Sequence, residues 1–252
     1  MTADVIQDVL TSAFNSQMQN LYTAIPCIVV SIRDSLNGQM VDIQPTINQK
    51  FKDGTVKERP TIQGIPVSFP VSSTAGMTFP IKPGDTGMAI FSMRNMDGWK
   101  SGNGRPVSPT NFAKMDKGDA IFLPGIQPPS MAVNNPGKHV LTHDTKDTVL
   151  FANLGASECE VRLKADGSIE INTSSQPVVI NCSDATVNAS GAINLNAQTM
   201  TVDCPSTLWI GDVVQQGNWT QTGTYVLNTI NINLHKHTGV QTGSGTSGPS
   251  TN

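Results

Sequence analysis

The sequence contains few charged, apolar and aromatic residues for its length. Of its 252 residues, 14% are charged and 37% are hydrophobic, whereas an average globular domain has about 25% charged and about 45–50% apolar residues when glycine is counted. The chain is therefore poor in the usual material of both a core and a surface. Its formal net charge of −3 is too weak to support nonspecific binding to a phosphate backbone, so we expect no nucleic-acid partner.

Long apolar runs and paired cysteines are also missing. The sequence has no run of 18 apolar residues, and its first thirty residues lack a basic start followed by an apolar stretch. We therefore expect neither a transmembrane helix nor a secretory signal. No two cysteines have the C-x-x-C spacing of a metal or redox pair, and we expect reduced, buried thiols at Cys27, Cys159, Cys182 and Cys204.

Charged residues are concentrated in the first two thirds of the chain. The sequence has 35 of them, 16 basic and 19 acidic, and from residue 171 to 252 the only ones are Asp184, Asp203, Asp212 and Lys236. Asn, Thr, Ser and Gly dominate this region, a composition that in isolation is typical of disorder. The alternation of apolar and polar residues favours strands instead.

The N-terminal part of the sequence predicts a helix followed by a small barrel. Apolar residues at helical spacing predict a short amphipathic helix that ends before Pro26 and packs on its own domain or on a neighbouring chain. Beyond it, short apolar runs separated by Gly and Pro turns predict about five strands. Five strands within about a hundred residues fit a closed barrel of the OB type. The helical positions are Val5, Ile6, Val9, Leu10, Phe14 and Met18, and the strand runs lie at 27–32, 40–45, 62–69, 88–93 and 120–123.

The pattern changes after about Gly137. Short alternating strands are predicted at 169–172, 178–182, 192–197 and 200–204, with an imprecise repeat of 22 to 24 residues that is typical of a β-solenoid. Each strand offers only two or three inward apolar side chains, so one chain is too thin to enclose a core. Three copies wound around a common axis would each contribute one stripe to a shared interior. The predicted fold is therefore all-β, with an N-terminal OB-fold barrel followed by an intertwined trimeric triple-stranded β-helix.

The four histidines form two pairs. His139 and His143 lie four residues apart in a segment with no helical pattern, and we expect them to be ordinary surface residues. His235 and His237 are two residues apart on an extended segment, so they project to the same side, and imidazole is the commonest metal ligand. In a trimer they would place six imidazoles around one point, which favours an octahedral metal such as Fe(II), Ni(II) or Co(II) over a four-coordinate Zn(II). The alternative is a pair of exposed histidines in a polar tail.

Three stretches resemble a known family. The C-terminal run from Leu234-His235-Lys236-His237-Thr238-Gly239-Val240 to Gly248-Pro249 is similar to the apex of the central spike of contractile phage tails, of the baseplate assembly protein V type. Pro83-Gly84-Asp85-Thr86-Gly87 and the later Asp116-Lys117-Gly118-Asp119 with the residues that follow resemble the N-terminal OB domain of larger spikes in this group. The resemblance covers roughly residues 20 to 130 and 165 to 250, and no lysozyme-like insertion is present.

The resemblance implies a mechanical role. It implies a homotrimer whose OB domain binds the tail hub or baseplate protein, located in the virion at the baseplate tip. It further implies that His235 and His237 of three chains bind one Fe ion, with room for other ions within the β-helix. On sheath contraction the point would pierce the host outer membrane, without enzymatic activity. The domains would be an N-terminal helix or arm at 1–24, the OB domain at 25–136, the β-helix at 137–233 and the metal-binding apex at 234–252.

Three other functions remain open at the level of sequence. A spike of a bacterial contractile secretion system would share the same physics. A β-helical enzyme that degrades polysaccharide normally needs two carboxylates across the scissile bond, but residues 171 to 252 contain no Glu and only three scattered Asp. An OB-fold nucleic-acid binder is disfavoured by the acidic balance and by the presence of only two tyrosines.

Overall fold

The structure is a computed structural model that describes residues 3–19, 21–35, 38–232, 234 and 243. Strands are the main regular secondary structure of these residues, and the chain divides into two units, Met1–Asn181 and Cys182–Asn252. The helices are α1 (Ala3–Gln19) and α2 (Asp97–Lys100), with short 3-10 turns at Pro129–Met131 and Pro136–Lys138. The strands are β1 (Ala24–Ser35), β2 (Gly38–Pro45), β3 (Gln49–Lys50), β4 (Val56–Lys57), β5 (Ile62–Pro66), β6 (Thr86–Phe91), β7 (Ala120–Pro124), β8 (Thr148–Ala152), β9 (Cys159–Leu163), β10 (Ile169–Thr173), β11 (Val226–Leu227) and β12 (Ile230–Asn231).

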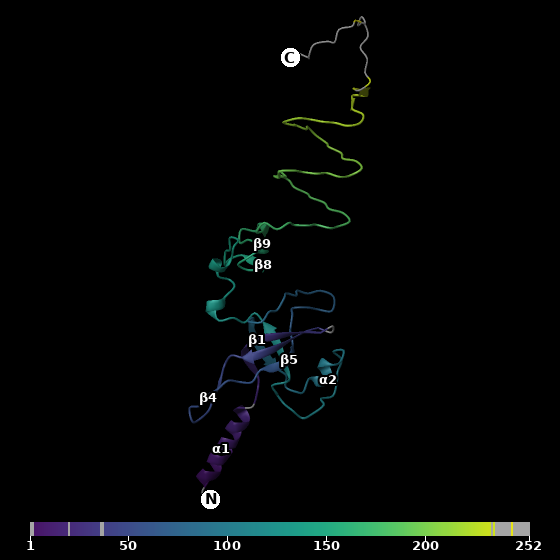
Figure 1. Ribbon diagram of the computed structural model, residues 1–252. Helices are drawn as coiled ribbons and strands as arrows, with labels where there is room; N and C mark the ends of the chain where they lie inside the picture. The colour runs from purple at the N-terminus through teal and green to yellow at the C-terminus, as the bar shows by residue number, and fades with distance from the viewer. Residues whose placement is uncertain (1–2, 20, 36–37, 233, 235–242, 244–252) are drawn as a thin grey trace. The chain divides into compact units, whose positions relative to one another are not determined.

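The first unit contains a curled five-stranded sheet in the order β5-β2-β1-β6-β7. All its neighbouring strands are antiparallel, and the long strand β1 pairs with β2 along one edge and with β6 along the other. The two outer strands approach each other, because Val67 forms a parallel bridge with Phe122 and the Ser68 amide donates to the Phe122 carbonyl at 2.8 Å. This order, closed by a parallel contact, is that of a partly open OB barrel. Figure 1 shows these strands around β1 and β5.

The barrel has its own apolar core. Alternate residues of its strands point inward, as the period of two requires, and Phe122, Ile43, Ile65 and Val41 are fully buried. Gly87 is needed where β6 passes β7, since a Cβ there would collide with the Phe122 ring and with the Leu123 carbonyl. The expected all-β class and the barrel strands are thus confirmed. The core residues are Cys27, Val29, Val41, Ile43, Ile62, Ile65, Ile81, Ala89, Phe91, Ala120 and Phe122.

A second sheet follows the barrel along the chain. It is a three-stranded antiparallel meander in the order β10-β9-β8. From Ser174 to Tyr225 the described chain forms no strand pairs at all, and β11 and β12 make a short hairpin after it. The strands expected at 178–182, 192–197 and 200–204 are therefore unpaired in a single chain. The reason is that a strand needs a neighbouring strand to accept and donate its backbone hydrogen bonds.

Helix α1 agrees with the helix expected from the sequence. It ends at Gln19, before Pro26, and its six apolar positions lie on one broad side. Among the described residues, no helix combines the length and apolar character needed to cross a membrane.

Candidate functional site

The β8–β10 sheet exposes an apolar face. In an antiparallel sheet, residues opposite one another share a face, and Leu150 lies opposite Val161, which lies opposite Ile171. These side chains are 56%, 39% and 62% exposed. Leu163 and Ile169 pair on the same face and are 49% and 68% exposed. We call these five residues, Leu150, Val161, Leu163, Ile169 and Ile171, the apolar sheet face.

The opposite face of this sheet carries buried charges. Arg162 contacts Glu160 at 2.7 Å, and both residues are at most 5% exposed. Lys164 donates to Glu170 at 2.9 Å, and Asn172 donates to Glu160 at 3.0 Å. A sheet that stands alone in water buries its apolar face and exposes its polar one. Here the arrangement is reversed, so the apolar sheet face is a candidate contact surface.

A buried ion pair anchors the segment that precedes β8. His139 Nδ1 lies 2.5 Å from Glu158 Oε1, and neither side chain has any exposed surface. The second oxygen of Glu158 accepts from the amides of Val140 and Leu141 at 2.7 and 3.2 Å. Burial alone would raise the pKa of Glu158, but the hydrogen bonds from His139 and from these two amides outweigh burial and lower the pKa below its ordinary value of 4.5.

The expectation that His139 is a surface residue is therefore wrong. Its Nε2 lies 2.9 Å from the Val133 carbonyl, which only accepts, so Nε2 carries a hydrogen. The His143 ring stacks on the His139 ring at 3.8 Å with an angle of 3° between the planes. His143 Nε2 in turn lies 2.7 Å from Asn134 Oδ1. No local pattern in the sequence predicts this cluster, because His139 and Glu158 are 19 positions apart.

The second candidate surface is the extended segment 182–225. Its backbone bends at 183, 190–191, 198, 205, 211, 217 and 223, and Figure 1 shows it running back and forth in straight pieces. The first three pieces between bends contain six residues each and the next three contain five each. Gly211, Gly217 and Gly223 occupy the last three bends with φ of 116°, 110° and 107°, a conformation that favours glycine. The straight pieces thus shorten from six to five residues along the segment.

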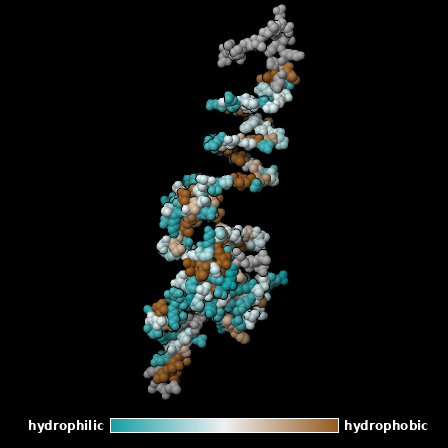
Figure 2. Space-filling view, viewed as in Figure 1, coloured by the Kyte–Doolittle hydropathy of each residue, from teal (hydrophilic) through white to brown (hydrophobic). Residues whose placement is uncertain are grey.

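The straight pieces have no core of their own. Their apolar residues are exposed, and Figure 2 shows apolar atoms open to view along this segment. Burying one such side chain contributes about 1.5–3 kcal/mol, so this many uncovered side chains strongly favour a partner. Examples are Leu208 at 83%, Trp209 at 70%, Ile210 at 91%, Val214 at 85% and Trp219 at 70% exposed.

The predicted metal ligands are not tested by the structure. His235 and His237 lie outside the described residues. Within the part of the chain that the structure describes, no group of three or more His, Cys, Asp or Glu residues is placed to hold a metal ion.

The cysteines are reduced, as expected, but only one is buried. Cys27 lies in the barrel core, where burial raises its thiol pKa to about 11, so it stays protonated at neutral pH. Cys159 is half-buried, and Cys182 and Cys204 are exposed. The last two differ from the expectation because they lie on the segment that has no core within one chain.

Comparison with known proteins places the barrel in a phage family. The described residues form an all-β protein with one barrel that has its own core and with two uncovered apolar surfaces. Residues 25–125 match the family described as Phage protein Gp138 N-terminal domain. The match covers β1 to β7 apart from Ala24, so this part of the chain is similar to a phage protein domain. No curated protein matches the chain.

The sequence analysis did not predict the apolar sheet face, although the sequence of β9 carries a signal for it. Cys159-Glu160-Val161-Arg162-Leu163 alternates strictly between charged and other residues, which is typical of a strand with two unlike faces. The alternation predicts the strand. It does not reveal that the charged face is the covered one.

Replacing Glu158 should lower the stability of the fold and should also reduce the loss of stability at acidic pH. We expect Glu158→Gln to lower the free energy of unfolding by about 1–3 kcal/mol at neutral pH, because a buried charged hydrogen bond is lost. The lowered pKa means that the stabilisation by Glu158 is present above pH 4.5 and is lost as the pH falls through the lower pKa of the folded state. Thermal unfolding between pH 7 and pH 3 should therefore show a smaller acid-dependent loss in Glu158→Gln than in the wild type. The exposed Glu58→Gln is the control, and equal pH profiles for all three proteins would contradict the assignment.

Proposed function

We propose that the protein is the trimeric central spike at the tip of a contractile phage tail, and that it pierces the host outer membrane when the sheath contracts. Three lines support the proposal: the phage domain at residues 25–125, the resemblance of the C-terminal sequence to spike apices, and the two uncovered apolar surfaces. The single observation that carries it is the last of these.

The uncovered surfaces suit three copies of the same chain. The apolar sheet face has five exposed aliphatic residues and no charge, so three such faces can meet around an axis without burying an ion. Segment 182–225 consists of short straight pieces between bends, without strand pairing in the single chain, and such pieces could lie against the same pieces of two further copies. Each copy would then supply the strand neighbours that the others lack.

The proposed action is mechanical and non-enzymatic. The OB barrel has a complete core, so it can bind the tail hub as a preformed unit. The charged face of the β8–β10 sheet, fixed by Arg162–Glu160 and Lys164–Glu170, would face away from the axis. The segment beyond carries few charges, which lowers the cost of passing through a membrane.

A metal at the apex is part of the proposal. His235 and His237 would hold one Fe ion per trimer, and six imidazole nitrogens are a donor set that suits Fe(II). When bound, the ion supplies crosslinks between three chain ends. Coordination of this kind contributes directly to folding.

The mass in solution tests the trimer. With a chain mass of 26.8 kDa, we expect the purified wild type to be three times as heavy, measured by light scattering. Ile171→Asp should shift the protein toward the monomer, because it would place three carboxylates on the buried axis. Glu58→Lys, on the exposed surface of the barrel, should leave the mass unchanged. A monomeric wild type would contradict the proposal.

Elemental analysis tests the apex. The trimer should contain about one transition-metal ion for three chains, from two histidines in each. The ion should be absent from His235→Ala/His237→Ala and retained in Lys236→Ala, which changes the residue between them. A metal content unaffected by the double substitution would place the ion elsewhere.

Electron microscopy tests the location. Antibodies against the purified protein should label the tail tip of the phage particles that contain it, one patch per particle, since a single trimer occupies the axis. Label on the capsid, or recovery of the protein from secreted material without particles, would contradict the tail location. The second result would favour the secretion-system alternative.

A further inference from the structure

The first three straight pieces of segment 182–225 repeat one apolar pattern. They comprise residues 184–189, 192–197 and 199–204. In each piece the second, fourth and sixth residues are apolar and the third and fifth are polar, so the apolar residues share one side of an extended chain. The apolar residues of the three pieces are Ala185, Val187 and Ala189, then Ile193, Leu195 and Ala197, then Met200, Val202 and Cys204.

This repeat leaves the alignment of several copies open. A copy displaced by one piece would put Val187 in the place of Leu195 and Leu195 in the place of Val202, with the apolar residues still on the same side. The apolar pattern is what selects the register of a strand, so a displacement that preserves the pattern is not excluded by it. From Ser174 to Tyr225 the single chain forms no strand pairs that would select one alignment. The first three pieces therefore do not fix their own register.

The β8–β10 sheet, in contrast, has a fixed internal register. Strand β9 pairs with β8 and with β10 over five consecutive positions, without a bulge in either pairing. The charged side of the sheet is covered within the chain, where Arg162 contacts Glu160 at 2.7 Å. The segment before β8 is tied to β9 by the contact of His139 with Glu158. The sheet is therefore already formed in a single copy.

The outward side of this sheet is graded from large to small side chains. Its residues form three rows across the strands, and none of the nine residues in these rows is charged. Three such sides can meet without bringing like charges together. A displacement by two residues along the strands would set large side chains against small ones and leave gaps, which destabilise a packed contact. One alignment is therefore preferred. The rows are Thr148, Leu163 and Ile169, then Leu150, Val161 and Ile171, then Ala152, Cys159 and Thr173.

We propose that the β8–β10 sheet sets the register of the trimer. The apolar sheet face of each copy packs on the same face of the two other copies in one alignment, and this alignment decides which pieces of segment 182–225 lie at the same level. This inference rests on the proposed trimer. It gives the sheet a role that the following segment does not fill by itself, because its first three pieces fit one another in more than one alignment.

Disulfide mapping in the full-length protein tests the register. Ala197 and Cys204 are the sixth residues of adjacent pieces, so Ala197→Cys places thiols at equivalent positions of two levels, and Cys182→Ser removes another thiol of the segment. After oxidation of the trimer with diamide, peptide mapping of the covalent dimer should find links between equal positions, 197 to 197 and 204 to 204. These links should exceed links from 197 to 204 at least about tenfold, because a disulfide forms only between closely spaced Cβ atoms. Equal yields, or no covalent dimer, would overturn the proposal.

Truncation of the apolar sheet face tests its role. In the same protein, Val161→Ala/Ile171→Ala should lower the ratio of equal to unequal links at least about fivefold, because the alignment is selected by these large side chains. Val202→Ala/Ile193→Ala removes the same two types of side chain from the segment and is the matched control, which should leave the ratio unchanged. An unchanged ratio in the sheet variant, or an equal decrease in the control, would overturn the proposal.

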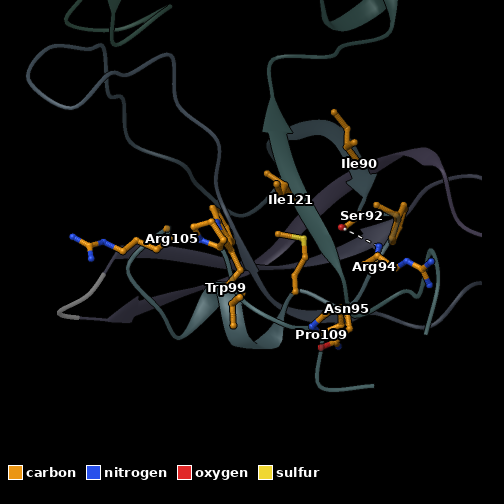
Figure 3. A pocket seen from close by; sticks show the side chains of 13 residues that line it. Ile90, Ser92, Arg94, Asn95, Trp99, Arg105, Pro109 and Ile121 are labelled. Atoms are coloured by element: carbon orange, nitrogen blue, oxygen red, sulfur yellow. Dashed lines mark hydrogen bonds between the residues drawn. The ribbon is translucent and has the colours of Figure 1, made fainter. Parts of the chain in front are cut away.

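A variant of the barrel is the second control. Ile90 of β6 lies opposite Ile121 of β7 on the outside of the barrel, where both line a hollow beside Trp99, as Figure 3 shows. Ile90 is 44% exposed, close to the 39% of Val161, but it lies outside the β8–β10 sheet. Ile90→Ala should therefore leave the ratio of links unchanged. A decrease as large as that of the sheet variant would show that any exposed apolar residue has this effect and would overturn the proposal.

Light scattering before oxidation separates the remaining outcomes. A sheet variant that is monomeric beside a trimeric segment variant supports the proposal, and the reverse result overturns it. If both double variants are monomeric, Ile171→Ala and Ile193→Ala replace them, with the same two readings. A monomeric wild type contradicts the proposed spike itself, whereas a trimer whose register does not depend on the sheet contradicts only the present inference.

Discussion

The distribution of apolar residues is the constraint on which the rest of the structure depends. The barrel buries its apolar residues within one chain, whereas the β8–β10 sheet and segment 182–225 expose theirs. Burial of apolar area is the dominant favourable term in folding. In a single chain the described residues of the second half therefore leave this term unsatisfied, and that is the physical basis of the proposed trimer.

The two faces of the β8–β10 sheet differ in what covers them. Its buried charges do not face water, and Glu158, Glu160 and Arg162 are each at most 5% exposed. Buried ions persist when they are paired and hydrogen-bonded. The contact of His139 with Glu158 meets both conditions, whereas Arg162 and Glu160 are paired at 2.7 Å but keep buried polar atoms without a hydrogen-bond partner. The charged side is thus covered within the chain while the apolar side stays exposed.

The barrel and the helix that precedes it differ in where they place their apolar residues. Residues 25–125 carry the match to the phage family and hold the core. Helix α1 adds a wide apolar side that is exposed in the single chain. The proposed contact around the axis likewise uses surfaces that the single chain leaves uncovered.

The local structure of the N-terminal part follows from the sequence alone. The 3.6-residue spacing from Val5 to Met18 predicts α1, because periodicity in one segment decides which side of that segment is apolar. Short apolar runs between Gly and Pro turns predict the barrel strands. The scarcity of charge after residue 170 likewise indicated a chain that needs partners, and the His235-Lys236-His237 motif rests on sequence alone. Contacts between distant segments come from the three-dimensional fold. Examples are the Val67–Phe122 bridge, the His139–Glu158 pair and the covering of the charged face of β9. These depend on which segments meet in space, and no local pattern encodes that.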